Sequence, residues 1–182
     1  MRKEKKAISA IVATVLLILI TVAAVGIIWG ALVPWITNIM RQGQVNQECI
    51  TATANLEIDT DAGLTYFINE SATKNATRVT VKRGGEEFDA AGIKIVIFGD
   101  GTSKSFDIEA GKNSTKIRMY PDGLYNGNLS IPGVSEESTY VIDVTGMFTL
   151  PTEVSVAPIV KVDNINAPCP VSDTATLLKK FV

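Results

Sequence analysis

Two cysteines, Cys49 and Cys169, carry the thiol chemistry of this 182-residue sequence, and they lie near the two ends of its polar part. In an oxidising compartment, an even pair at the ends of one domain is typical of a disulfide. Closing a loop of about 120 residues contributes on the order of 4 to 5 kcal/mol in the chain-entropy model. The alternatives are two buried free thiols or a bridge between chains, and a redox motif would need closer spacing.

Four Asn-x-Ser/Thr sequences are candidates for a second chemistry, N-glycosylation. They begin at Asn69, Asn75, Asn113 and Asn128. We expect sugar on some of them if the domain is exported, because this tripeptide is the acceptor sequence. The alternative is that they are ordinary loop asparagines beside Thr-rich strands.

Catalytic and metal chemistry is not expected. The sequence has no His, which removes the commonest general base and the commonest metal ligand. Asp59, Asp61 and Glu70 imitate the acidic positions of a calcium loop, but Leu64 stands where that loop needs Gly. The formal net charge is −2 and no basic block follows the first six residues, which argues against nucleic acid. We therefore expect no enzyme, no metal or cofactor, and no nucleic-acid partner.

An uncharged segment from Ala7 to Met40 accounts for most of the apolar composition. Within it, residues 8–33 would form a helix about 39 Å long, longer than the roughly 30 Å hydrocarbon core of a bilayer. Arg2, Lys3, Lys5 and Lys6 precede the segment, whereas Arg41 alone follows it closely. The positive-inside rule therefore places the N-terminus in the cytoplasm and the rest of the chain outside.

The length of this segment argues against an ordinary cleaved secretory signal, whose apolar region is about 7 to 15 residues long. Gly26 and Gly30 form a G-x-x-x-G pair, which lets two helix backbones approach closely. Pro34 lacks a backbone N–H, so we expect a kink or local melting between Gly30 and Pro34.

The run from Arg2 to Ile20 resembles the start of archaeal type IV pilin-like proteins, a superfamily that includes adhesion pilins and archaellins. The resemblance implies that a short basic leader precedes the apolar helix and is removed by a membrane prepilin peptidase, which leaves the helix on the mature protein. The cut would fall between Ala7 and Ile8, with Lys5 and Lys6 as the basic pair that the peptidase reads.

Two positions depart from the patterns of pilins. Ala10 stands where many members have Pro, and Ala continues a helix better. Val12, the fifth residue of the mature protein, stands where bacterial pilins have Glu, and archaeal members generally lack that acid too. The second departure argues against a bacterial pilin and leaves the archaeal resemblance intact.

Beyond Met40 the pattern changes. Residues 41–48 are polar and predict the end of the helix and a connector, with a break at Gly43. Apolar residues then alternate with polar ones, as in Val79 and Val81, and turn sequences separate about eight short segments. The predicted strands cover 49–58, 65–69, the residues around 79–81, 93–97, 105–109, 115–120, 139–144 and 153–162.

These segments predict an α+β chain: a long apolar N-terminal helix followed by an antiparallel β-sandwich of the immunoglobulin-like kind found in pilin heads. We expect a leader at 1–7, the helix and connector at 8–47, and the extracellular β-sandwich at 48–182.

The favoured hypothesis is a structural subunit of an archaeal type IV pilus-like filament, with an adhesive role suggested by analogy. Its partners would be further copies of itself, the prepilin peptidase and the assembly platform. The precursor would lie in the cytoplasmic membrane, and the mature protein in a filament at the cell surface. The alternatives are an exterior binding module with a permanent membrane anchor, and a minor or tip pilin.

Overall fold

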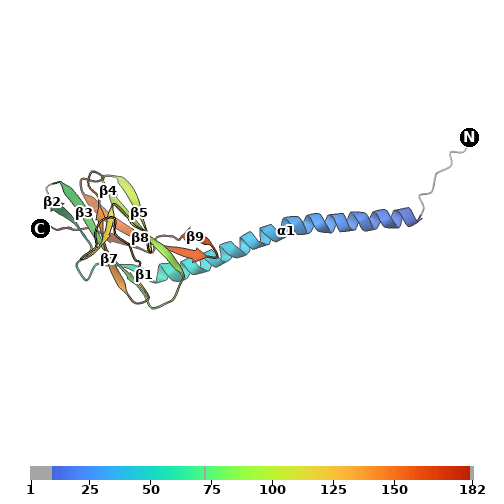
Figure 1. Ribbon diagram of the computed structural model, residues 1–182, viewed down its shortest axis with the longest axis horizontal. Helices are drawn as coiled ribbons and strands as arrows, with labels where there is room; N and C mark the ends of the chain where they lie inside the picture. The colour runs from blue at the N-terminus through green and yellow to red at the C-terminus, as the bar shows by residue number, and fades with distance from the viewer. Residues whose placement is uncertain (1–9, 72, 181–182) are drawn as a thin grey trace, which may run out of the picture. The chain divides into compact units, whose positions relative to one another are not determined.

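The computed structural model describes residues 10–71 and 73–180 of the chain (Figure 1). The chain divides after Gly43 into two compact units. The described part of the first unit is entirely helical, and the second, Gln44–Val182, contains the end of the same helix and all the strands.

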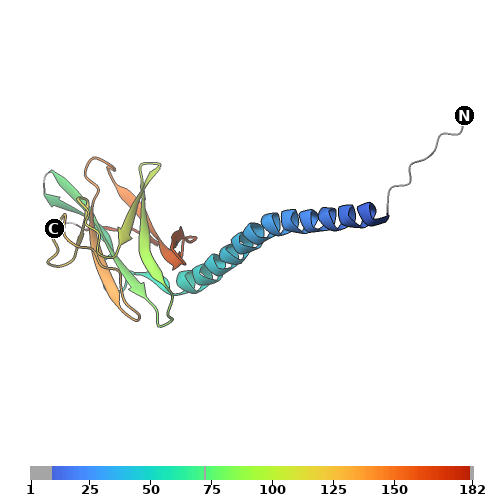
Figure 2. The same ribbon diagram turned by 45° about the vertical axis from the view of Figure 1, so that its right-hand side comes forward.

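The helix α1 runs from Ala10 to Ala54 and is 45 residues long. Its hydroxyl groups are satisfied inside the helix: Thr14, Thr21 and Thr37 each donate a hydrogen bond of 2.9 Å to the carbonyl three residues earlier. The turn before Pro34 is helical, so the local melting that we expected there is not observed. The ribbon bends near the middle of α1 without a break (Figure 2).

The predicted end of the helix is wrong. Residues 41–48 continue α1, Gly43 does not break it, and residues 49–54 are helical instead of forming the start of a strand. Gly inside a helix costs roughly 1 kcal/mol relative to Ala. Burial offsets that cost, because Cys49 and Ala52 pack into a small apolar cluster of the β-domain. The helix ends where the Asn55 side chain donates to the Thr51 carbonyl at 2.9 Å.

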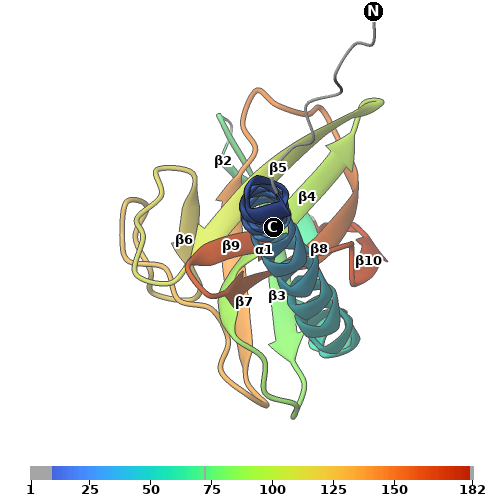
Figure 3. The same cartoon turned by 90° about the vertical axis from the view of Figure 1, so that its right-hand side faces the viewer.

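Two sheets make up the β-domain, and Figure 3 shows strands of both as arrows that run across the view. Within the described residues the strands are β1 (Leu56–Asp59), β2 (Tyr66–Ser71), β3 (Lys74–Arg83), β4 (Ala90–Gly99), β5 (Thr102–Glu109), β6 (Ile117–Met119), β7 (Glu137–Asp143), β8 (Pro151–Val162), β9 (Ile165–Pro168), β10 (Asp173–Thr176) and β11 (Lys179–Lys180). One sheet has the order β11-β2-β3-β7-β6, with β1 also paired to β3. The other has the order β10-β8-β4-β5, with β9 also paired to β8. All pairings are antiparallel except the short one between β11 and β2.

The main core lies between the two sheets and follows the alternation seen in the sequence. Val79 and Val81 of β3 face Ile95 and Ile97 of β4 in one cluster, and all four side chains are fully buried. Tyr140 of β7 is also buried in this cluster, and its hydroxyl donates to the Ser130 carbonyl at 2.8 Å. The predicted α+β architecture, with a long apolar helix and a β-sandwich, is confirmed.

Replacing Ile95 by Ala tests this core. The side chain is fully buried between the sheets, so Ile95→Ala should lower the free energy of unfolding by about 2 to 5 kcal/mol. Ile165→Ala is the matched control. The Ile165 side chain is 45% exposed, so this variant should lose much less free energy of unfolding. Urea denaturation followed by circular dichroism measures both. Equal losses would contradict the placement of Ile95 in the core.

Candidate assembly surface, disulfide junction and glycosylation sites

The side-chain surface of α1 is apolar on every side over most of its length. All residues from 11 to 40 are exposed, including Trp29 at 66% and Trp35 at 61%. By length and composition alone, α1 is able to cross a membrane. An apolar surface of this extent is stable only in lipid or against other apolar helices.

Gly26 and Gly30 lie one turn apart on this surface and therefore share a face of the helix. Apart from the adjoining residues and the nearby backbone of α1 itself, no described atom lies within 4 Å of the position that a Cβ would take at either glycine. The helix backbone is thus open to close approach along this face, and the packing role of the pair stays a prediction.

The expected processing site lies outside the described residues. Lys5, Lys6, Ala7 and Ile8 all precede Ala10, the first residue of α1. The leader and its cleavage therefore stay predictions from the sequence.

A disulfide joins Cys49 to Cys169, as the sequence predicted. Cys49 lies in the last turns of α1 instead of opening a strand, and Cys169 follows β9. Both cysteines are buried, in a cluster with Ala52, Phe88 and Val160. The Cys169 N–H also donates to the carbonyl of Pro158 in β8 at 2.9 Å. The bond therefore ties the end of the helix to the sheet that contains β8.

Removing this disulfide should destabilise the β-domain strongly. The bond closes a sequence separation of 120 residues, so the paired variant Cys49→Ser, Cys169→Ser should lose on the order of 4 to 5 kcal/mol of unfolding free energy. Urea denaturation of the purified chain in detergent, followed by circular dichroism, measures the loss. Reduction of the unmodified chain should give a similar loss, and an unchanged midpoint in both cases would contradict a stabilising bridge.

The four candidate glycosylation sites come together as two cross-strand pairs. Asn69 of β2 is the register partner of Asn75 of β3, and Asn113 is bridged to Asn128. Directly opposite residues in an antiparallel pair have Cβ atoms about 4.5 to 5.5 Å apart on one face. Two oligosaccharides on one pair would therefore compete for the same space.

The two members of the first pair differ in access. Asn69 is exposed, whereas Asn75 is half-buried, and its N–H donates to the Thr145 hydroxyl at 3.0 Å. Thr77, which completes the second acceptor sequence, is fully buried. The backbone N–H of Thr145 in turn donates a hydrogen bond to the Asp143 carboxylate at 2.9 Å. Burial acts to raise the pKa of Asp143, but the hydrogen bonds from Thr145 and the charge of Lys116 outweigh it, and the pKa lies below 3.8. At neutral pH Asp143 is therefore charged and keeps its hydrogen bond to Thr145, while the partial burial of Asn75 and the full burial of Thr77 restrict access to this acceptor sequence.

The pairing predicts which asparagines carry sugar. In protein isolated from native cells, peptide mass spectrometry should find sugar on Asn69 and not on Asn75, and on one member at a time of Asn113 and Asn128. Double occupancy of either pair on a single chain would contradict the steric argument. A chain with no added mass would refute the glycosylation expectation itself.

Comparisons with known proteins add little. No family model matches the sequence, and no curated protein matches it. Among solved structures, the chain is similar to one described as the archaellum periplasmic stator protein complex FlaF and FlaG from Sulfolobus acidocaldarius. That likeness covers 68% of this chain and 88% of the other, with 11% identity and a TM-score of 0.30. A likeness this low supports no inference about the function of this chain.

Proposed function

We propose that this chain is a structural subunit of a type IV pilin-like filament on an archaeal cell surface. The observation that carries the proposal is the uncharged, wholly exposed surface of α1 from residue 11 to residue 40, directly behind a basic N-terminal segment. A globular domain does not need such a helix for its own stability, since the main core of the β-domain contains no residue of α1. The helix therefore serves a membrane, an assembly, or both in turn.

The proposed mechanism is physical. The precursor waits in the membrane, a peptidase removes residues 1–7, and the helices move from lipid into a common bundle. Lipid is already apolar, so leaving it yields little hydrophobic gain, and close packing at small residues must hold the helices together. Contacts repeated by a screw operation then extend the assembly as an open filament.

The β-domains would form the exterior of this filament, and the disulfide suits an oxidising exterior. The chain would associate with further copies of itself, and the prepilin peptidase and assembly platform would act on the precursor. The role is structural and not enzymatic, and an adhesive function rests on analogy with the pilins that the N-terminus resembles.

Mass spectrometry of protein sheared from the surface of native cells tests the proposal. We expect recovery in filaments and a mature N-terminus at Ile8. A chain that keeps Met1 and is released only by detergent would contradict it, and would leave the alternative of a membrane-anchored binding module. Recovery in trace amounts beside another, abundant subunit would indicate a minor or tip pilin.

Replacing the two glycines tests the assembly step separately. Gly26→Leu with Gly30→Leu should still insert into the membrane, because Leu favours insertion, but should yield far fewer filaments, because the backbones can no longer approach. Ala24→Leu is the matched control, since positions two apart do not share a helix face. Electron microscopy of sheared material counts the filaments. Equal yields from all three proteins would exclude packing through the glycines.

A further inference from the structure

Cations gather on the outer face of the sheet that contains β3, although the β-domain as a whole is acidic. Of the 17 Lys and Arg and 19 Asp and Glu in the chain, five and one lie in residues 1–43, which leaves the β-domain a formal charge of −6. Its basic face consists of Lys74, Arg78, Arg118 and Lys180, which come from β3, β6 and β11.

Three tyrosines hold the basic face together. The Arg78 guanidinium lies 4.3 Å from the ring centroid of Tyr120 and donates to the Tyr66 hydroxyl at 2.7 Å. Lys180 lies over Tyr66 at 4.7 Å. Cation–π contacts of this kind fix the positions of the cations without neutralising them.

Lys74 and Arg118 lie over a third ring, that of Tyr125, at 5.6 and 5.5 Å. Among the described residues, Arg78, Lys74 and Lys180 have no carboxylate within ion-pair distance. Lys116, a neighbouring cation, is by contrast paired with Asp143 at 3.4 Å. The basic face thus presents ordered positive charges that an anionic partner could use.

Acidic side chains occupy the opposite end of β3. The acidic loop, residues 84–89, joins β3 to β4 and carries Glu86, Glu87 and Asp89, all exposed. Glu48 of α1 lies beside it, and together with Glu87 and Asp89 it lines an open depression of about 400 Å³. A depression of this size accepts a Lys or Arg side chain.

Buried contacts hold the acidic loop in place. Phe88 is 8% exposed, and the Arg83 guanidinium packs 4.0 Å from its ring centroid and donates to its carbonyl at 2.7 Å. The Asn55 amide donates to the Glu86 carboxylate at 3.1 Å. The loop is therefore ordered before any partner arrives, which lowers the entropic cost of binding.

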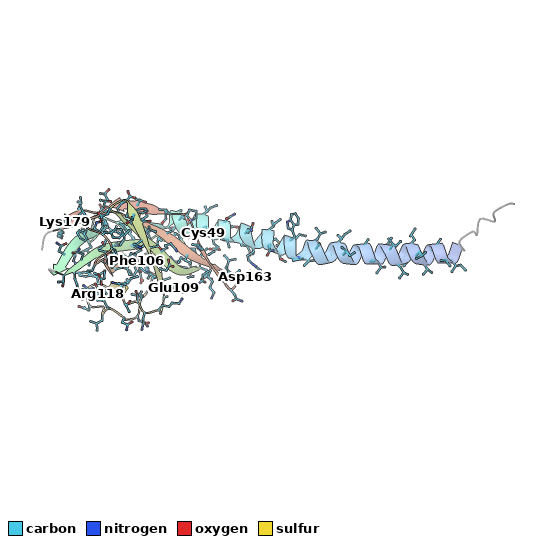
Figure 4. The ribbon with its side chains drawn as sticks, turned by 90° about the horizontal axis from the view of Figure 1, so that it is seen from above. Cys49, Phe106, Glu109, Arg118, Asp163 and Lys179 are labelled. Carbon is cyan, nitrogen blue, oxygen red and sulfur yellow. A yellow bond between two sulfur atoms is a disulfide. The ribbon has the colours of Figure 1, made fainter. Side chains whose placement is uncertain are left out.

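The two charged regions of one chain cannot neutralise each other. Along β3, Lys74 precedes the first loop residue by ten positions and Arg78 precedes it by six, which is about 33 Å and about 20 Å in an extended strand. The Debye length at physiological salt is about 8 Å. Figure 4 shows Arg118 and Lys179 at the end of the β-domain away from Cys49. The charges are complementary between two copies and not within one.

We propose that the basic face of one β-domain binds the acidic loop of a second copy. The contact is head to tail: each copy uses its basic face to contact one neighbour and its acidic loop to contact another. Such an interface can repeat along a chain of copies without closing. It refines the proposed filament, but it is a property of the β-domain and is tested without any filament.

A charge-exchange experiment on the purified full-length chain in detergent tests this contact. One variant reverses the face, Lys74→Glu with Lys180→Glu, and a second reverses the loop, Glu87→Lys with Asp89→Lys. Lys104→Glu with Lys112→Glu is the control, because it makes the same charge change as the face variant at exposed lysines that belong to neither surface. Association between two differently tagged preparations is measured in 50 mM and 500 mM salt.

We expect each reversed variant alone to self-associate about 10-fold more weakly than the unmodified chain or the control, since like charges then face each other. Mixing the two variants should restore association, because the reversed face of one again matches the reversed loop of the other. In 500 mM salt, association should weaken for the unmodified chain, for the control and for the mixture of the two variants.

The proposal is overturned if the mixture associates no better than either variant alone. The rival occupant is an acidic polysaccharide, for which alginate is the probe. Alginate binding that is lost in the face variant and kept in the loop variant, without recovery in the mixture, would assign the basic face to a polysaccharide. Neither result bears on filament formation through α1, so this proposal can fail while the proposed function stands.

Discussion

The exposed apolar surface of α1 is the constraint on which the rest of the molecule depends. Thirty consecutive residues, 11–40, are exposed and uncharged, and water is the one environment in which they are unstable. Lipid and a bundle of like helices are the two environments in which these apolar residues are stable. The proposed function takes the helix from one to the other, and a helix with no polar face and with its Thr hydroxyls bonded within it suits both.

The end of α1 is attached firmly to the β-domain. In the proposed filament, a loose connector would leave the β-domain free to move relative to the helix. α1 continues to Ala54, where the disulfide between Cys49 and Cys169 and a cluster with Phe88 and Val160 fix its last turns to the domain. The acidic loop starts beside this junction, because the Gly84 N–H donates to the Asn55 carbonyl at 2.8 Å. Helix end, disulfide and acidic loop are thus one ordered region.

The sequence predicted those parts of the fold that depend on local patterns. The helix, the core strands such as β4 and β8, and the disulfide all follow from hydropathy, alternation or cysteine placement. The end of the helix was not predictable in this way, because burial of Ala52 and Cys49 outweighs the cost of Gly43. β9, β10 and β11 are too short and too polar to show alternation, and pairing with longer strands defines them. The basic face was missed since its residues lie far apart in the sequence.

The chain has two tryptophans, and both lie in α1, so tryptophan fluorescence reports on the helix alone. The most direct measurement is quenching of Trp29 and Trp35, first in membranes that contain the precursor and then in sheared, lipid-free filaments. We predict quenching by brominated lipid in the membrane. In the filament we predict emission typical of a buried indole and protection from acrylamide. Quenching of the tryptophans by acrylamide in the filament would contradict a bundle of α1 helices. Release of the chain from the membrane only by detergent would contradict it too.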